Sequence, residues 1–262
     1  MVVTGVSRRA GIGFAIARRA AELGADVFCH HFAPHDAQQP WGADEIDAVL
    51  EGVRERVRPG GAFGQLHADL ADPAQPARVL AAARRALGRV DGLVVNQAMS
   101  GSDGPLSSIT AEELDRHWAV DGRASLLLAQ AFAAGHEPGR HGSIVFLTSG
   151  QGQGPMPGEL AYAAAKAAVA GVLATLEDEL APLGIRVNAV NPGPVDTGYF
   201  TPELHRALAP ALPFGRAGQP QDAARLVCWL LSGQAGWVSG QTLHAEGGFA
   251  RHRIGLCGEL PE

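Results

Sequence analysis

The stretch VVTGVSRRAGIG, residues 2–13, joins an apolar strand to the start of a helix through a turn that is rich in glycine. Gly5, Gly11 and Gly13 lack a Cβ, so a bulky ligand can come close to the backbone there. The helix that follows offers free N–H groups and the positive end of its dipole to an anion. At the first strand-to-helix turn of an α/β protein, this combination predicts a site for the pyrophosphate of a dinucleotide.

Apolar runs typical of strands alternate with helical segments along the rest of the chain. This alternation predicts a parallel sheet that is covered on both faces. We expect a single doubly wound α/β domain with about seven strands over residues 1–249, followed by a C-terminal tail over residues 250–262. Later strands are expected within 25–32, 62–70, 91–96, 143–149, 185–190 and 241–246, and helices within 11–23, 43–57, 73–87, 111–134 and 220–232 and around Tyr162, whereas 33–42 is expected to be a loop.

The composition fits a globular protein, with 262 residues, 46% of them hydrophobic, and a net charge of −6. Mixed acidic and basic residues argue against a nucleic acid or a membrane as partner. Cys29, Cys228 and Cys257 are scattered, which indicates reduced thiols in a cytoplasmic protein. No stretch approaches the roughly 20 apolar residues of a membrane span, and no signal peptide is visible. The first strand is short at its front, which leaves room for a few residues ahead of Met1.

The charge near the second strand bears on which dinucleotide is bound. NAD sites usually carry an acid at the end of that strand, but this chain has Cys29, His30, His31 and Phe32, and no acid before Asp36. Arginine suits the 2′-phosphate of NADP because of its fixed charge and its fork of donors. The sequence therefore favours NADP(H), with NAD(H) as the alternative, and candidate contacts are Ser7, Arg8, Arg9 and His31. The other possibility is that both arginines only face solvent.

Residues at the ends of the third and fourth strands are also candidates for the cofactor site. Asp69 and Leu70 are expected beside the adenine ring, and Asn96 and Ala98 beside the rest of the cofactor. Asp69 could instead be a turn residue that caps the next helix. The histidines at 30, 31 and 35 have no evident acidic or cysteine partner, so we expect no metal site.

Three residues predict acid/base chemistry. Tyr162 and Lys166 are four residues apart on an alanine-rich helix and therefore share a face, and Ser149 ends an apolar strand. A lysine ammonium beside the phenol favours the phenolate and lowers the tyrosine pKa. The tyrosine can then give a proton to a carbonyl oxygen or take one from an alcohol.

Together these motifs resemble the short-chain dehydrogenase/reductase family over nearly the whole chain. The resemblance is carried by TGVSRRAGIG, Asp69, VVNQA, Ser149, Tyr162 with Lys166, RVNAVNPGPVDT and VSGQTLHAEGG. Within the family, GRAGQPQDAA and SGQTLHAEGG are most similar to 3-oxoacyl-acyl-carrier-protein reductases, which implies a ketoreductase. The family implies hydride transfer between a nicotinamide and a carbonyl or alcohol carbon, and commonly a homotetramer.

The resemblance also implies roles for particular residues. Tyr162 is then the general acid/base, Lys166 lowers its pKa and binds the nicotinamide ribose, and Ser149 orients the substrate oxygen. The cofactor would be held by Gly5, Gly11, Ile12, Gly13, Asn96, Pro192, Gly193, Val195 and Thr197. Asp121 occupies the position at which the family usually has a catalytic asparagine, so its carboxylate is expected to oppose the effect of Lys166. Gln97 and Met99 are bulkier than the usual residues.

The substrate end is the least specified part of the predicted site. Met99, Gln151, Met156 and Tyr199 are candidate contacts, and residues 199–214 are typical of a lid. Alternatively, the leucines of that segment only pack on the core. We expect a small-molecule or carrier-bound carbonyl substrate. Two other functions stay open: non-redox acid/base chemistry on the same fold, such as dehydration, isomerisation or cyclisation, and a non-catalytic binding subunit.

Overall fold

The computed structural model describes residues 1–100 and 103–256 of the chain. Its strands form one parallel sheet in the order β3-β2-β1-β4-β5-β6-β7. The order reverses between β1 and β4, and at such a reversal an open sheet forms a ligand crevice. The predicted doubly wound α/β fold is therefore confirmed. The strands are β1 (Val2–Val3), β2 (Val27–His31), β3 (Phe63–His67), β4 (Gly92–Val95), β5 (Gly142–Leu147), β6 (Ile185–Asn191) and β7 (Thr242–His244).

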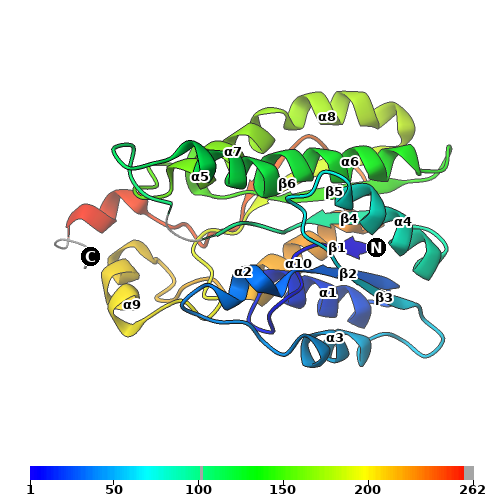
Figure 1. Ribbon diagram of the computed structural model, residues 1–262, viewed down its shortest axis with the longest axis horizontal. Coiled ribbons are helices and arrows are strands. Elements are labelled where there is room, and N and C mark those ends of the chain that lie inside the picture. Colours follow the sequence, from blue (N-terminus) through cyan, green and yellow to red (C-terminus); the bar gives the residue numbers. More distant parts are fainter. Residues whose placement is uncertain (101–102, 257–262) are drawn as a thin grey trace.

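Helices cover both faces of the sheet (Figure 1). One face carries α1 (Ile12–Glu22), α3 (Ile46–Arg54) and α10 (Pro220–Leu231). The other carries α4 (Gln75–Leu87), α5 (Ala111–His117), α6 (Ala124–Ala134), α7 (Leu160–Gly171) and α8 (Leu173–Leu180). Each helix of these two layers lies within a segment for which the sequence predicts helical structure.

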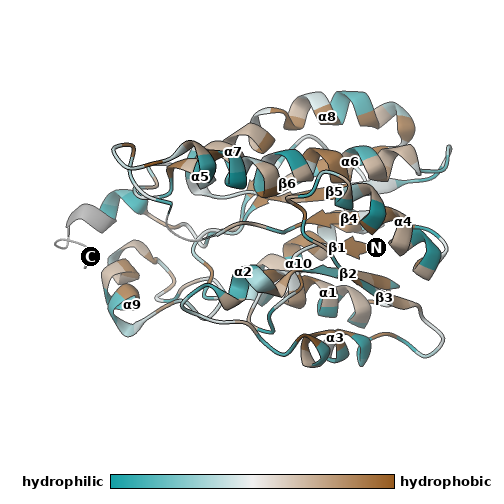
Figure 2. Cartoon of the chain, in the orientation of Figure 1, coloured by the Kyte–Doolittle hydropathy of each residue, from teal (hydrophilic) through white to brown (hydrophobic). Residues whose placement is uncertain are grey.

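The core consists of two layers, one on each side of the sheet, and Figure 2 shows the apolar central strands between the helices. Successive residues of a strand point to opposite faces, so each strand contributes to both layers. In β4, for example, Leu93 and Val95 belong to the layer under α4 and α6, and Val94 belongs to the layer under α1 and α10. This double burial explains why the strands are continuous apolar runs in the sequence.

Two segments differ from the elements that the sequence predicts. The expected loop over residues 33–42 contains a short helix, α2 (Ala33–Ala37). The expected continuous helix over residues 111–134 is interrupted by a π-helix, η1 (Trp118–Arg123), between α5 and α6. Gly122 is necessary there because a Cβ on it would lie 2.3 Å from the Trp118 ring. Thr110 and Glu113 form a capping box at the start of α5.

The segment Leu160–Leu183 is long and apolar enough to cross a membrane by length and composition alone, contrary to the expectation that no stretch approaches that length. Only 28% of its most apolar window is buried inside the single chain. The segment covers α7, α8 and a 3-10 turn, so it also carries Tyr162 and Lys166 to the site.

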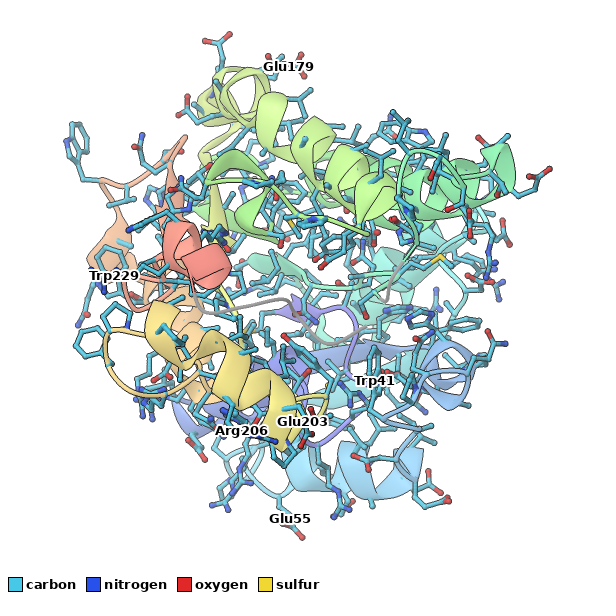
Figure 3. The ribbon with its side chains drawn as sticks, turned by 90° about the vertical axis from the view of Figure 1, so that its left-hand side faces the viewer. Trp41, Glu55, Glu179, Glu203, Arg206 and Trp229 are labelled. Carbon is cyan, nitrogen blue, oxygen red and sulfur yellow. The ribbon has the colours of Figure 1, made fainter. Side chains whose placement is uncertain are left out.

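Two shorter elements lie at the carboxyl edge of the sheet. They are α9 (Pro202–Leu208) and η6, a 3-10 segment (Arg251–Leu256) within the expected C-terminal tail. Figure 3 looks onto this edge, with α9 and its labelled residues Glu203 and Arg206 in front, beside the tail segment. Cys257 and the rest of the expected tail, 257–262, lie outside the described residues.

Candidate active site

The carboxyl ends of the strands open onto a cavity of about 1470 Å³. It is large enough for a dinucleotide together with a small substrate. Five of the predicted site residues, all within the described chain, do not line it: Arg9, Gly13, His31, Asp121 and Gln151. The other predicted site residues do line the cavity: Gly5, Ser7, Arg8, Gly11, Ile12, Asp69, Leu70, Asn96, Ala98, Met99, Ser149, Met156, Tyr162, Lys166, Pro192, Gly193, Val195, Thr197 and Tyr199.

The glycine-rich turn forms a tight cradle at the floor of the cavity. Gly5 has a φ of 70°, a conformation that favours glycine, and a Cβ on it would lie 2.9 Å from Asn96 Nδ2. Gly13 does not line the cavity, but a Cβ there would lie 2.4 Å from the carbonyl oxygen of Gly5. Gly11 is the N-cap of α1, and no side chain caps this helix, so its first N–H groups have no side-chain acceptor. The cradle and the open helix end fit the pyrophosphate of a dinucleotide.

Arg8 lies in the cavity between several partners. Its Nε is 3.1 Å from Asp36 Oδ1, its guanidinium stacks 5.2 Å from the centroid of the Trp41 ring, and Nη2 donates to Thr197 Oγ1 at 3.3 Å. Asp36 also accepts a hydrogen bond from the Ser7 hydroxyl at 2.5 Å. Burial lowers the pKa of Arg8, and the charge of Asp36 raises it. Asp36 and Trp41, which the sequence did not single out, therefore belong to this end of the site.

Arg9 and His31, both predicted as cofactor contacts, point elsewhere. Arg9 pairs with Asp44 at 3.7 Å, and 63% of its side chain is exposed. Arg9 therefore faces solvent, which was the alternative interpretation of both arginines. His31 turns its Nε2 toward Gln65 Oε1 at 2.8 Å. Of the two adjacent histidines, it is His30 that lines the cavity, with Nδ1 accepting from the Gly5 N–H and Nε2 on the Ala68 carbonyl.

The ends of β3 and β4 brace the cradle as well as lining the cavity. Asp69 Oδ1 accepts the N–H of Ala71 at 2.9 Å, so Asp69 is a turn residue, and it also lines the cavity. Asn96 Nδ2 donates to the carbonyls of Thr4 (2.9 Å) and Gly5 (3.2 Å). Gln97 is buried and donates to the Val120 carbonyl of the π-helix. Asn96 and Gln97 thus tie β4 to the glycine-rich turn and to η1.

Ser149, Tyr162 and Lys166 meet at the middle of the cavity. Ser149 follows β5, and the other two share one face of α7, as their spacing predicts. The Lys166 ammonium lies 5.6 Å from the centroid of the Tyr162 ring and donates to the Leu147 carbonyl at 3.0 Å. Lys166 is 3% exposed, so its charge is held in a medium that screens it weakly.

The pKa directions differ from the simple expectation of a lowered tyrosine. Burial raises the pKa of Tyr162, the negative charge of Asp121 raises it further, and a hydrogen bond with Ser149 lowers it. Burial lowers the pKa of Lys166, and Asp121 raises it. Because a buried phenol is easier to keep neutral than to ionise, burial favours the protonated form of Tyr162.

Asp121 lies behind the cavity wall, on the π-helix. Its side chain is fully buried, Oδ1 accepts the N–H of Met99 at 2.8 Å, and Oδ2 is 3.3 Å from His117 Nδ1. Its side chain does not line the cavity, but its charge raises the pKa of both Tyr162 and Lys166. His117 was not among the predicted site residues, although it precedes Asp121 by four residues, a spacing that places two helical side chains on one face.

The opposite end of the cavity is largely apolar. Met99, Met156 and Tyr199 line it as predicted, together with Leu204 and Leu208 of α9. Gln151 does not reach it. Leu208 is also 9% exposed, so α9 both borders the cavity and packs inward. Burial raises the pKa of Tyr199 to about 12, which keeps this phenol neutral.

The expected C-terminal tail adds a charged pair to this end. Arg251 lines the cavity and forms an ion pair with Glu246 at 3.1 Å. A Cβ on Gly150 would lie 1.8 Å from Arg251 Nη2, so a glycine beside Ser149 makes room for this arginine. Trp237, in contrast, is fully exposed and does not line the cavity.

Pro192, Gly193, Val195 and Thr197 follow β6 along the cavity. Gly193 has a φ of 68°, and its N–H donates to Asn191 Oδ1 at 3.0 Å, which forms the turn out of the strand. Among the described residues, no group of three or more His, Cys, Asp or Glu side chains could hold a metal ion.

Comparisons with known proteins agree with this geometry. A family model described as "Enoyl-(Acyl carrier protein) reductase" matches residues 5–250. The uncharacterized oxidoreductase YjdA of Bacillus subtilis is 40% identical over 252 residues, which cover 95% of this chain and 96% of that protein. The NADPH-dependent aldehyde reductase-like protein, chloroplastic, of Arabidopsis thaliana is 34% identical over 256 residues, covering 95% and 93%.

The fold is also that of solved structures. Acetoin dehydrogenase YohF from Salmonella typhimurium superposes with a TM-score of 0.79 at 28% identity, over 95% of this chain and 94% of that one. The narrower resemblance to 3-oxoacyl-acyl-carrier-protein reductases receives no support from these comparisons and stays a prediction. The protein is an oxidoreductase, of a kind that uses NAD(P)(H) and small carbonyl or alcohol substrates. The chain therefore belongs to the short-chain dehydrogenase/reductase family.

Proposed function

We propose that this enzyme reduces a ketone or aldehyde with NADPH, and that Tyr162 is the general acid. The observation that carries the proposal is the convergence of Ser149, Tyr162 and Lys166 in the cavity that also contains the glycine-rich cradle. The proton donor and the dinucleotide site thus share one enclosed space. A nicotinamide cofactor supplies the hydride when it is bound.

The residues of the chain have separate tasks in this reaction. The hydroxyl of Tyr162 gives its proton to the carbonyl oxygen as that oxygen gains negative charge. Ser149, which hydrogen-bonds Tyr162, orients the oxygen and helps to hold its charge. Lys166, fixed by the Leu147 carbonyl, places a positive charge beside the phenol and so stabilises the phenolate that remains.

The protonated state of Tyr162 supports reduction as the favoured direction near neutral pH. Burial raises the pKa of this phenol, so it holds a proton that it can donate. Alcohol oxidation needs the phenolate, and its rate is therefore expected to rise toward alkaline pH.

Arg8 supports NADPH as the cofactor. Of the two neighbouring arginines of the glycine-rich turn, it is Arg8 that reaches the cavity, and β2 is followed by Phe32, a position with no acid for the ribose of NADH. Asp36 partly neutralises Arg8, so we expect a moderate preference and do not exclude turnover with NADH. The name of the Arabidopsis relative, which is 34% identical, points the same way.

The apolar lining supports a partly apolar carbonyl substrate. Met99, Met156, Leu204 and Leu208 surround the end of the cavity near Ser149 and Tyr162. Since α9 borders this end, we propose that it closes over the substrate as a lid. A carrier-bound substrate would have to thread its acyl chain past α9.

The apolar surface left open on Leu160–Leu183 supports a homotetramer, in which helices of neighbouring subunits cover one another. Sedimentation at micromolar concentration tests this, and a monomer would contradict it. Cys29 and Cys228 are buried free thiols, which supports a reducing compartment, the cytoplasm. Fractionation of the native host tests that location.

The decisive experiment has two parts. Calorimetric titrations with NADPH and NADH in parallel measure the cofactor preference, and a panel of ketones and aldehydes then tests for stoichiometric NADPH oxidation. Tyr162→Phe should lower kcat by about 100-fold or more while NADPH binding is retained. Turnover without NADPH oxidation would favour the non-redox alternative, and NADPH binding with no turnover on any substrate would favour a binding subunit.

A further inference from the structure

A buried histidine lies between two buried carboxylates directly behind the reacting residues. Asp103, which precedes α5, His117, at the end of α5, and Asp121, on η1, have side chains that are 1%, 5% and 0% exposed. His117 Nδ1 is 3.3 Å from Asp121 Oδ2, and His117 Nε2 is 3.7 Å from Asp103 Oδ2. The imidazole thus bridges the two acids, and we refer to these three residues as the His117 bridge.

Each carboxylate of the bridge holds a backbone amide of the active site. Asp103 Oδ2 accepts the N–H of Tyr162 at 2.6 Å, in the first turn of α7, which has no side-chain cap of its own. Asp121 Oδ1 accepts the N–H of Met99 at 2.8 Å. The His117 ring also meets the Tyr162 ring edge-on, with centroids 6.3 Å apart. The bridge therefore links the helix of the proton donor to the wall of the substrate pocket.

The two ring nitrogens face acceptors on both sides. A neutral imidazole has one N–H donor and one lone pair, so it directs a proton at only one of the carboxylates, whereas an imidazolium can hydrogen-bond Asp121 at 3.3 Å and direct a charged N–H at Asp103, 3.7 Å away. Two carboxylates buried without a cation are strongly disfavoured. Asp103 Oδ1 is buried and has no hydrogen-bond partner, which increases the need for a nearby positive charge.

The carboxylates of the bridge change the pKa values of neighbouring groups. The negative charge of Asp121 raises the pKa of Tyr162, and that of Asp103 raises the pKa of the neighbouring Glu159. The ionisable groups around the ring are thus Asp103, Asp121, Glu159, Tyr162 and Lys166. Without a cation on His117, the charges of Asp103, which holds the Tyr162 N–H, and of Asp121, which raises the pKa of Tyr162, would lack this counter-charge.

We propose that His117 is a positioning residue that, as a doubly protonated bridge, holds Asp103 and Asp121 on their backbone amides and keeps their charge from opposing proton transfer at Tyr162. This proposal rests on the proposed role of Tyr162 as the general acid/base. His117 touches neither cofactor nor substrate in it. It acts through the two carboxylates that it pairs.

The test is the pH profile of His117→Gln. In this variant the carboxylates keep their charge and lose the cation, so the apparent pKa of Tyr162 should rise. In the pH–rate profile of alcohol oxidation, the fall-off in rate on the acid side is expected to shift to higher pH by about one to two units. The kcat near neutral pH should be lower by at least about ten-fold, and KM should change little. The matched control is His136→Gln, a half-buried histidine at the end of α6 that bonds the Arg140 carbonyl and should leave the profile unchanged.

A second substitution distinguishes an effect of charge from a loss of packing at His117. Adding Asp121→Asn to His117→Gln removes one uncompensated charge, so the profile should return most of the way to that of the wild type. A uniform loss of kcat at every pH, with no shift and no rescue, would overturn the proposal and leave His117 as a packing residue. Calorimetric titration with NADPH and thermal melting show whether each variant is folded.

Hydrogen–deuterium exchange tests the bridge without turnover. The amides of Met99 and Tyr162 should exchange faster in His117→Gln than in the wild type or in His136→Gln. Unchanged exchange at both amides would overturn the bridge even if the enzyme is an active reductase. Conversely, faster exchange in a protein that turns over no substrate would retain the bridge and reject the proposed function.

Discussion

Arg8 and Asp36 form an ion pair inside the cofactor cleft, with Nε and Oδ1 3.1 Å apart and about an eighth of each side chain exposed. The pair joins the glycine-rich turn to α2, and Trp41 stacks on the guanidinium. The residue best suited to bind a 2′-phosphate is thus already paired with an acid of the same chain. The strength of cofactor discrimination should depend on this competition.

Asp36→Asn should bind NADPH more tightly, by about three- to ten-fold, because Arg8 would then meet the phosphate without a competing carboxylate. NADH affinity should change by less than two-fold or so, since it has no 2′-phosphate to gain. Calorimetric titrations with both cofactors measure this. Glu51→Gln, which removes the exposed partner of Arg54 on α3, is the control and should alter neither affinity. Weaker NADPH binding in Asp36→Asn would mean that the acid holds Arg8 in its binding position.

Gly13→Ala should destabilise the protein by more than about 2 kcal/mol, since its Cβ would lie 2.4 Å from the carbonyl oxygen of Gly5 and 2.7 Å from Asn96 Nδ2. Backbone cannot move away at that point without opening the cradle. Gly171→Ala, at the end of α7, is the matched control, because no atom lies within 4 Å of its added Cβ. It should be neutral or stabilising by up to about 1 kcal/mol. Urea unfolding of both variants distinguishes the steric cost from the general effect of replacing glycine.

His30 should make the protein less stable in acid. Burial lowers its pKa to about 4 in the folded chain, from the ordinary value of 6.5, so the unfolded chain binds the proton first. Its contribution is complete above pH 6.5 and is lost as the pH falls toward 4, with about 2 kcal/mol lost between pH 7 and pH 5. The amino group of Met1, with its pKa lowered to about 6, adds a loss of the same sign between pH 8 and pH 6.

His30→Gln tests this assignment because an amide can reproduce both bonds of the ring, to the Gly5 N–H and the Ala68 carbonyl. The free energy of unfolding in urea at pH 5, 6 and 7 should fall less steeply with acid in this variant. His205→Gln, which removes a largely exposed histidine, should keep the slope of the wild type. Equal slopes in all three proteins would contradict a buried neutral His30.

The fold could be predicted from the sequence because strands buried on both faces are apolar throughout and alternate with helices. The π-helix could not, since Gln97, which follows a distant strand, donates to the Val120 carbonyl within it. The helix at Ala33–Ala37 could not be predicted from the sequence either, because five residues that include a proline resemble a turn.

The sequence predicted that the glycine-rich turn and the three acid/base candidates would lie in one cavity. It predicted less well which partners the charged side chains would have. Ser149, Tyr162 and Lys166 come together because strand ends and helical spacing are local properties. Arg8 and Arg9 are adjacent in sequence, yet the tight turn sends one into the cavity and the other to Asp44. The partners Asp36 and Arg251 depend on contacts between distant segments, which no local pattern encodes.

Asp121→Asn in the otherwise unchanged enzyme should retain activity or raise it. The asparagine keeps an oxygen for the Met99 N–H and removes the charge that raises the pKa of Tyr162. The phenolate then forms more easily, so the acid limb of alcohol oxidation should move to lower pH, by up to about one unit. Steady-state kinetics in both directions from pH 6 to 10 measure the shift, and Asp178→Asn, an exposed charge on α8, should leave it unchanged. A loss of kcat of about 100-fold or more would show instead that the carboxylate takes part in proton transfer, because a group that acts only through its field cannot have so large an effect when its charge is removed in the favourable direction.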